Sequence, residues 1–82
     1  MIGALMEWDE VQLGPEDRET QRTYRRRRGL SWCYLHLHRL PDGSWDAILY
    51  DETTRMLDHD HVDTPNEARL WAERRLEAMF AE

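Results

Sequence analysis

The sequence predicts an α+β fold: a three-stranded antiparallel β-meander over residues 30–62, with a C-terminal α-helix packed on one face. Two observations carry this prediction. Residues 30–40 and 44–52 are rich in aliphatic and aromatic side chains and flank a Pro-Asp-Gly turn, and residues 64–80 repeat apolar side chains at helical spacing. Because the chain has 82 residues, we expect residues 30–82 to form one β-β-β-α domain, preceded by an N-terminal arm over residues 1–29.

The arm has an acidic half and an arginine-rich half. Residues 1–17 carry five acidic and no basic side chains, whereas residues 18–28 carry six arginines and one acid. The first 14 residues suit either a short strand or a docking arm. Pro15 at a first helical position and Gly29 as a stop predict a short helix over Pro15–Arg28, although Tyr24 is its only large apolar residue.

The first two strands of the meander are connected by Pro41-Asp42-Gly43, in which the glycine suits a left-handed backbone. A type I turn with a glycine bulge pairs Leu40 with Ser44. Counting outward predicts the opposed pairs on each face. On one face they are Leu37 and Ala47, Leu35 and Leu49, and Cys33 and Asp51; on the other they are His38 and Asp46, His36 and Ile48, Tyr34 and Tyr50, and Trp32 and Glu52.

A weaker third strand is predicted over Arg55–Val62, after a turn at residues 51–54. The helix begins with a capping box, in which Thr64 is the N-cap and Glu67 reaches back. Its apolar stripe includes Ala68, Trp71 and Leu76 and should cover the sheet face that carries Leu35 and Leu49, while Glu73 is expected on the wet side.

The order strand, Asp-Gly turn, strand, strand and a T-x-x-E-A helix start resembles HicB-type antitoxin domains and double-stranded-RNA-binding-like folds. The resemblance covers residues 30–80 and implies a fold outline without functional residues. The chain departs from RNA-binding domains at the helix start, where Asp63-Thr64-Pro65-Asn66-Glu67 stands in place of a lysine-rich segment.

If the helix covers one sheet face, an aromatic and histidine patch occupies the other. Its candidate interaction residues are Trp32, Tyr34, His36, His38 and Tyr50, alongside Ile48. An exposed aromatic patch on a small protein is typical of a contact surface. The structural alternative is that residues 1–28 fold over this face, with Leu5 and Trp8 filling the gap, since small domains have little apolar surface to spare.

Two charged surfaces give further candidates. Asp58, Asp60 and Asp63 cluster in and after the third strand and, in a chain of net charge −6, could imitate a phosphate backbone and occupy a basic groove on another protein. An arginine belt could instead grip phosphates of a nucleic acid. That belt consists of Arg22, Arg25, Arg26, Arg27 and Arg28. For both surfaces the alternative interpretation is a solvated face.

Metal and catalytic chemistry are not predicted. The pairs His36/His38 and His59/His61 each have a spacing that places them on one face, but the meander separates the pairs by about 10 Å. Each pair lacks the further ligands of structural zinc, and His38 is expected beside Asp46. Cys33 is expected to be a small buried hydrophobe rather than a nucleophile, and no phosphate loop or nucleophile motif is present.

These observations predict a small non-enzymatic regulator or inhibitor of the kind phages and mobile elements encode, which binds another protein and needs no cofactor. The alternative is a nucleic-acid-binding, antitoxin-like regulator that uses the arginine belt. A homodimer is a further option. The single cysteine, the lack of an apolar run of membrane-spanning length and the acidic N-terminus predict a cytoplasmic location.

Overall fold

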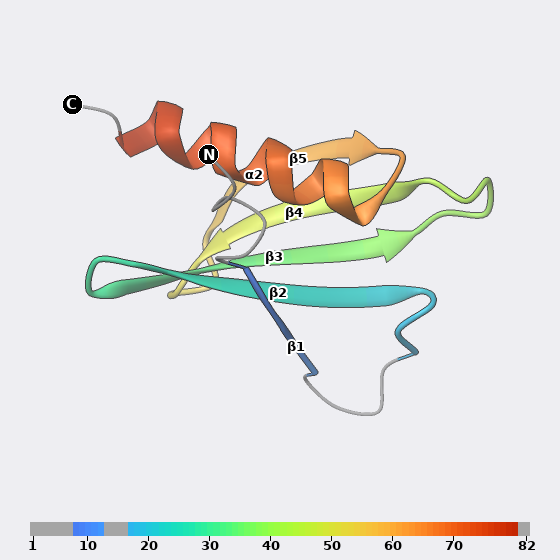
Figure 1. The fold of residues 1–82 in the computed structure, drawn as a ribbon, viewed down its shortest axis with the longest axis horizontal. Coiled ribbons are helices and arrows are strands. Elements are labelled where there is room, and N and C mark those ends of the chain that lie inside the picture. Colours follow the sequence, from blue (N-terminus) through green and yellow to red (C-terminus); the bar gives the residue numbers. More distant parts are fainter. Residues whose placement is uncertain (1–7, 13–16, 81–82) are drawn as a thin grey trace.

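The computed structural model describes residues 8–12 and 17–80, apart from the side chain of Phe80. It is an α+β fold in which one helix lies across one face of a five-stranded antiparallel sheet (Figure 1). The elements are β1 (Asp9–Val11), β2 (Gln21–Arg28), β3 (Ser31–Arg39), β4 (Trp45–Asp51), β5 (Met56–Val62) and α2 (Pro65–Phe80). The strands lie side by side in chain order, so the predicted meander is present and is two strands wider than expected.

The helix predicted over residues 15–28 is wrong for the described part of that segment, because residues 21–28 form strand β2. All eight residues of β2 pair with β3, from Gln21 opposite His38 to Arg28 opposite Ser31. A helix there would have had no apolar face to bury, whereas a strand satisfies its backbone on β3 and places Tyr24, 3% exposed, in the core.

Gly29, interpreted from the sequence as a helix stop, instead connects two strands. Its φ of +62° lies at the first central position of the two-residue hairpin between β2 and β3. A type II′ hairpin requires a positive φ at that position, which glycine adopts without a Cβ clash. A glycine at this position is therefore compatible with the end of a helix or with a β-hairpin, and its identity alone did not distinguish the two.

The predicted β3–β4 register is confirmed for all six pairs from Cys33–Asp51 to His38–Asp46. The turn is as expected: Gly43 has a φ of +91° and donates its N–H to Leu40 O at 2.9 Å, while the Leu40 N–H donates to Ser44 O at 2.8 Å. The turn residues and the alternation of side chains along both strands favour the same pairing of β3 with β4, so the register could be predicted from the sequence.

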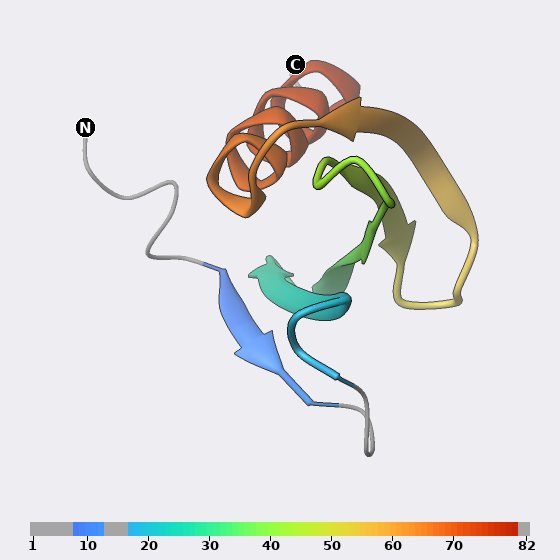
Figure 2. The same ribbon diagram turned by 90° about the vertical axis from the view of Figure 1, so that its right-hand side faces the viewer.

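Helix α2 covers the predicted face and contacts β3, β4 and β5, as the end-on view shows (Figure 2). The core beneath it contains Trp8, Tyr24, Cys33, Leu35, Leu37, Trp45, Ala47, Leu49, Val62, Ala68, Ala72 and Leu76. Trp71, a member of the predicted apolar stripe, is only partly buried where it packs against this cluster. No helix in the described ranges is long and apolar enough to cross a membrane.

The helix start follows the predicted capping chemistry with one difference. The Glu67 N–H donates to Thr64 Oγ1 at 3.1 Å, as an N-cap requires. Glu67 Oε2 accepts from the N–H of Asp63, at 3.3 Å, rather than from that of Thr64. The start of α2 is therefore capped on the residue that directly follows β5.

Candidate functional site

The sheet face away from α2, called the open face below, gathers most of the candidate residues. Pairing register assigns side chains to it, because directly opposed residues of an antiparallel sheet share a face. The face includes Asp9 and Val11 of β1; Gln21, Thr23, Arg25 and Arg27 of β2; Trp32, Tyr34, His36 and His38 of β3; Asp46, Ile48 and Tyr50 of β4; and His59 and His61 of β5. The five aromatic and histidine candidates predicted from the sequence are thus brought together.

The expectation that residues 1–28 fold over the open face is not met by the described part of that segment. Strands β1 and β2 extend the sheet sideways instead of covering it (Figure 2). Trp8, 6% exposed, belongs to the core cluster. Leu5 lies outside the described residues. Trp32, Tyr34, His36, Ile48 and Tyr50 are consequently only half-buried, and His38 is exposed.

Two arginines of the belt join the open face beside Trp32. The guanidinium carbon of Arg25 lies 4.6 Å from the centre of the Trp32 ring, and that of Arg27 lies 5.5 Å from it. Cations at this distance over an indole are attracted by its electron-rich face. Tryptophan, tyrosine and arginine therefore occur together on one exposed surface, a grouping that the predicted helix over residues 15–28 had hidden.

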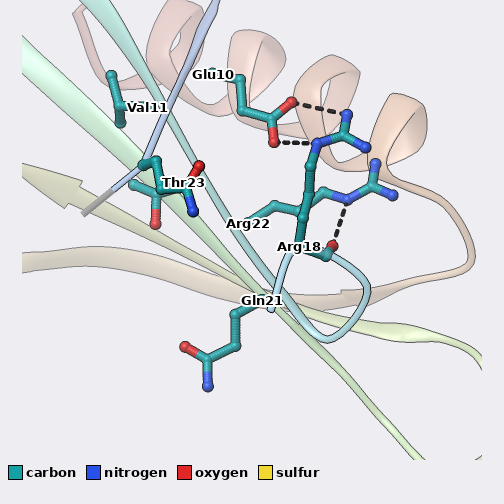
Figure 3. Close-up of a pocket in the computed structure, with 7 residues that line it drawn as sticks. Glu10, Val11, Arg18, Gln21, Arg22 and Thr23 are labelled. Carbon is teal, nitrogen blue, oxygen red and sulfur yellow. Dashed lines mark hydrogen bonds and ion pairs between the residues drawn. The ribbon is translucent and has the colours of Figure 1, made fainter. Parts of the chain in front are cut away.

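The rest of the belt is directed elsewhere. Arg26 alternates to the α2 side and forms an ion pair with Glu73. Arg22 donates from Nε to Arg18 O at 3.0 Å and lies over the Trp45 ring, while Arg18 forms two hydrogen bonds with Glu10 at 2.6 and 2.9 Å (Figure 3). The crevice among these groups has a volume of about 20 Å³, room for about one water. The belt is therefore divided between two faces rather than presented as one cationic strip.

The acidic candidates lie apart from the open face. Asp58 and Asp60 share the α2 side of β5, and each accepts a 2.8 Å hydrogen bond from the N–H of the following histidine. Asp58 also pairs with Arg75 at 2.5 Å, and Asp63 precedes the helix cap. Carboxylates that occupy N–H groups of an edge strand protect it from pairing with another chain. Asp58 and Asp60 thus have structural partners within the chain.

Two of the histidines on the open face lie close to polar side chains of neighbouring strands. His36 Nδ1 lies 3.0 Å from Thr23 Oγ1, and His59 Nε2 lies 3.7 Å from Asp46 Oδ1. Asp46 thus contacts His59 across β4 and β5, whereas the sequence favoured His38, which is its β3 neighbour in register. Among the described residues, no three histidine, cysteine or acidic side chains are grouped as a metal site.

Ser44 lies between Asp42 and His61, a grouping that the sequence did not indicate. Its hydroxyl oxygen is 2.5 Å from Asp42 Oδ1 and 2.6 Å from His61 Nε2. Because the carboxylate only accepts, the hydroxyl donates to Asp42, and His61 Nε2–H donates to the hydroxyl. The hydrogen bonds from Ser44 lower the pKa of Asp42. This order is the reverse of a nucleophilic triad, in which histidine accepts the serine proton, so the group locks the β3–β4 turn to β5.

Cys33 lies on the α2 side, 4% exposed, as the sequence predicted. Burial raises the pKa of its thiol. A thiol with a raised pKa is a weak nucleophile at neutral pH, in keeping with a packing role.

A depression in the open face is lined by three of the predicted candidates, Tyr34, His36 and Tyr50, together with residues outside that candidate set. It has a volume of about 510 Å³ and is bounded by Thr23, Tyr34, His36, Tyr50, Asp51, Glu52 and Thr54. The predicted register placed Tyr34 opposite Tyr50 and Trp32 opposite Glu52, which was the available signal for an acid at the edge of the aromatic patch. The Trp32 N–H in fact donates to Glu52 Oε1 at 3.2 Å.

The chain matches no protein-family model, and comparisons with curated proteins and with solved structures gave no match. The functional argument therefore rests on the open face and its chemistry.

Proposed function

We propose that this protein is a small non-enzymatic protein-binding module, a regulator or inhibitor, that engages its partner through the open face. The observation that carries the proposal is the extension of the sheet by β1 and β2, which leaves Trp32, Tyr34 and Tyr50 half-exposed beside Arg25 and Arg27. Tryptophan, tyrosine and arginine are the residue types that most often dominate the binding energy of protein interfaces. A sheet face also holds such side chains in a fixed array, which lowers the ordering cost of binding.

The proposal assigns partner binding to the open face, whereas the sequence had also suggested the acidic cluster of Asp58, Asp60 and Asp63. Asp58 is paired with Arg75, and both Asp58 and Asp60 accept backbone N–H groups of β5. Reversing these charges would disturb the edge strand, so we expect their contribution to binding to be smaller than that of the open face.

The test compares capture of a partner from a lysate of the native host by the wild-type chain and by Tyr34→Ala. Tyr34→Ala should lower recovery of the specific partner at least about tenfold, since interface tyrosines commonly contribute more than about 1.4 kcal/mol. Leu70→Ala is the matched control, because Leu70 is an apolar side chain on α2 with 38% exposure. Thermal unfolding of each variant confirms that it is folded. Equal capture by both variants would contradict the proposal.

A second candidate function is binding of single-stranded nucleic acid, favoured by one observation: Arg25 and Arg27 share the open face with Trp32, Tyr34 and Tyr50. Aromatic side chains that stack on bases, next to cations for phosphates, form such binding surfaces. Glu52, which accepts from the Trp32 N–H at the edge of the same face, weighs against it, as does the net charge of −6. Fluorescence anisotropy with a labelled oligonucleotide distinguishes the two, since nucleic-acid binding would weaken steeply as salt is raised.

A further inference from the structure

Trp32 holds two arginine side chains of the neighbouring strand on the open face. Arg27 is directly opposite Trp32 in the β2–β3 register, and Arg25 lies two residues away on the same face of β2. The guanidinium carbon of Arg25 is 4.6 Å from the centre of the Trp32 ring, and that of Arg27 is 5.5 Å from it. Both cations therefore lie over one ring, which restricts their side chains and lowers the entropy that a ligand would have to remove.

The two guanidinium groups have no carboxylate partner in the described part of the chain. Arg27 donates from Nε to Gly29 O at 3.1 Å, a hydrogen bond that fixes the side chain along the β2–β3 hairpin. Neither Arg25 nor Arg27 forms an ion pair with a described residue. Arg26, which lies between them in sequence, is instead ion-paired with Glu73. The exposed face of β2 thus presents two positioned arginines without the anion that their inward-facing neighbour has.

The acidic side chains beside this pair have other positions or other partners. Asp9 lies directly opposite Arg25 in the β1–β2 register, yet these two described side chains form no ion pair. Glu52 Oε1 accepts from the N–H of Trp32 at 3.2 Å and is thereby bound to the backbone of β3. An anion from outside the chain can therefore reach the two guanidinium groups.

Fixed charge on the open face is balanced, whereas the chain as a whole is acidic. By register the face carries Asp9 and Asp46 against Arg25 and Arg27, so the net charge of −6 is carried by residues outside this set. All four histidines of the chain also share the face, and protonation of any of them adds positive charge there. They are His36 and His38 of β3 and His59 and His61 of β5. The open face is thus a surface on which an acidic ligand meets little of the chain's negative charge.

We propose that Arg25 and Arg27 bind carboxylate side chains in an acidic, extended segment of the partner protein, with Trp32 as the platform that orients both arginines. The inference rests on the proposed function and names the chemistry of the partner. A planar guanidinium can donate two parallel N–H bonds to one carboxylate, which gives both strength and orientation. Because the arginines are two residues apart on one face of a strand, carboxylates two residues apart in an extended segment match their spacing.

The division of the arginine belt favours protein carboxylates over a nucleic acid. A single strand carries one phosphate per nucleotide and is bound along a cationic groove. Arg22 and Arg26 of the belt alternate to the α2 side of β2, which leaves Arg25 and Arg27 on the open face. Two carboxylates match two guanidinium groups, whereas a longer polyanion would extend past them toward the flanking acids.

The test is a titration of the ¹⁵N-labelled full chain with the peptide acetyl-Glu-Gly-Glu-amide, followed by ¹H–¹⁵N NMR. The neutral control, acetyl-Gln-Gly-Gln-amide, keeps the shape of the peptide and removes both charges. We expect saturable shifts at the indole N–H of Trp32 and at the amides of residues 25–27. The glutamine peptide should bind at least about fivefold more weakly.

Two variants of the site and one matched control locate the binding. Arg27→Gln should weaken binding of the glutamate peptide about fivefold, and Arg25→Gln should have a similar effect. Arg74→Gln removes the same charge from an exposed position on α2, across the other sheet face, and should leave the affinity unchanged. Thermal unfolding of each variant confirms that it is folded.

Equal binding of the two peptides, the absence of saturable shifts, or the same loss in Arg74→Gln would overturn the proposal. A single-stranded oligothymidine that shifts the same signals at a lower concentration than the glutamate peptide would overturn it in favour of the nucleic-acid function. If the glutamate peptide does not bind but partner capture still depends on Tyr34, the proposed function stands and this inference fails. If the peptide binds as expected and Tyr34→Ala captures partner normally, the carboxylate site stands and the proposed function fails.

Discussion

Arg26 and Glu73 form an ion pair between β2 and α2 whose side chains are only 15% and 8% exposed. Glu73 was expected on the wet side of the helix because of its charge, and that expectation is wrong. The charge is compensated by an arginine that the predicted helix over residues 15–28 would have placed in solvent. A buried pair of this kind makes each partner costly to remove, because the other is left as an isolated buried charge.

We therefore predict that Glu73→Ala lowers the free energy of unfolding by about 3–5 kcal/mol. The double variant Arg26→Met with Glu73→Met should be more stable than Arg26→Met alone or Glu73→Met alone, since neither charge is then left alone; these three variants and the wild-type chain form the cycle. Urea unfolding of the four proteins measures the coupling. Additive losses would show that the two side chains do not act as a pair.

Thr54 gives a prediction of the opposite sign. Its φ of +66° is strained for threonine and accessible to glycine, so Thr54→Gly should raise the free energy of unfolding by about 1 kcal/mol. Thr53→Gly is the matched control and should lower it, because the Thr53 hydroxyl donates to Asp51 Oδ1 at 2.7 Å. Thermal unfolding ranks the variants, and a less stable Thr54→Gly would contradict the strain argument.

Two turn aspartates predict how stability depends on pH. The Thr53 hydroxyl lowers the pKa of Asp51 from 3.8, and the Ser44 hydroxyl lowers that of Asp42 from the same value. A carboxyl whose pKa is lower in the folded state stabilises the fold above its unfolded pKa, and this contribution is lost as the pH falls through the folded value. The urea midpoint should therefore fall as the pH drops below about 4. Asp51→Asn should flatten that decline, because it removes one of these two carboxyl groups whose pKa is lowered by folding.

At the scale of elements, α2 is bound to the sheet by its small and aliphatic residues. Ala68, Ala72 and Leu76 have no exposed surface, whereas Trp71 is half-buried at the margin of the core. Alanines permit close approach of the helix axis to the sheet, which leaves no room for an indole directly beneath it. The largest side chain of the apolar stripe consequently packs along the side of the helix.

Leu76→Ala should lower the free energy of unfolding by about 2–5 kcal/mol, because it leaves a cavity in the fully buried centre. Trp71→Ala should cost less than Leu76→Ala, because the Trp71 side chain is only partly buried. Chemical denaturation of both variants gives the order. A larger loss for Trp71→Ala would mean that the indole is buried more deeply than the fold shows.

At the scale of the whole molecule, β2 pairs with β1 on one side and with β3 on the other, so that residues from both halves of the sequence form one sheet. Its eight residues pair with β3, Tyr24 enters the core, and Arg26 reaches α2. In a chain of 82 residues, little apolar surface is buried beyond what stability requires. The segment that the sequence suggested was an arm is thus a structural part of the sheet.

A fragment of residues 29–82 should accordingly fail to fold cooperatively, although it contains the predicted β-β-β-α unit. It would expose the β3 edge and leave Glu73 buried without Arg26. Circular dichroism during heating is the measurement, with the full chain as reference. A sharp transition in the fragment would show that β1 and β2 are dispensable additions.

The sequence by itself determined the β3–β4 register, the Gly43 turn, the start of α2 and the face on which Trp32, Tyr34 and Tyr50 meet. Each of these follows from signals a few residues apart: period-2 alternation, turn chemistry and a capping side chain. Most aromatic members of the candidate site could be placed for that reason. Counting outward from one turn is enough to assign their face.

Only the tertiary structure decided the state of residues 21–28 and the positions of their arginines. This segment has one large apolar residue and no clear periodicity of apolar side chains. Its conformation therefore depends on partners distant in sequence, which are the backbone of β3, the core residues around Tyr24 and the carboxylate of Glu73. The contacts of Arg25 and Arg27 with Trp32 were hidden for the same reason, since both arginines join the open face only when residues 21–28 pair with β3. In these cases contacts between residues far apart in the sequence supply the free energy that stabilises the observed conformation, and local secondary-structure propensity does not predict such contacts.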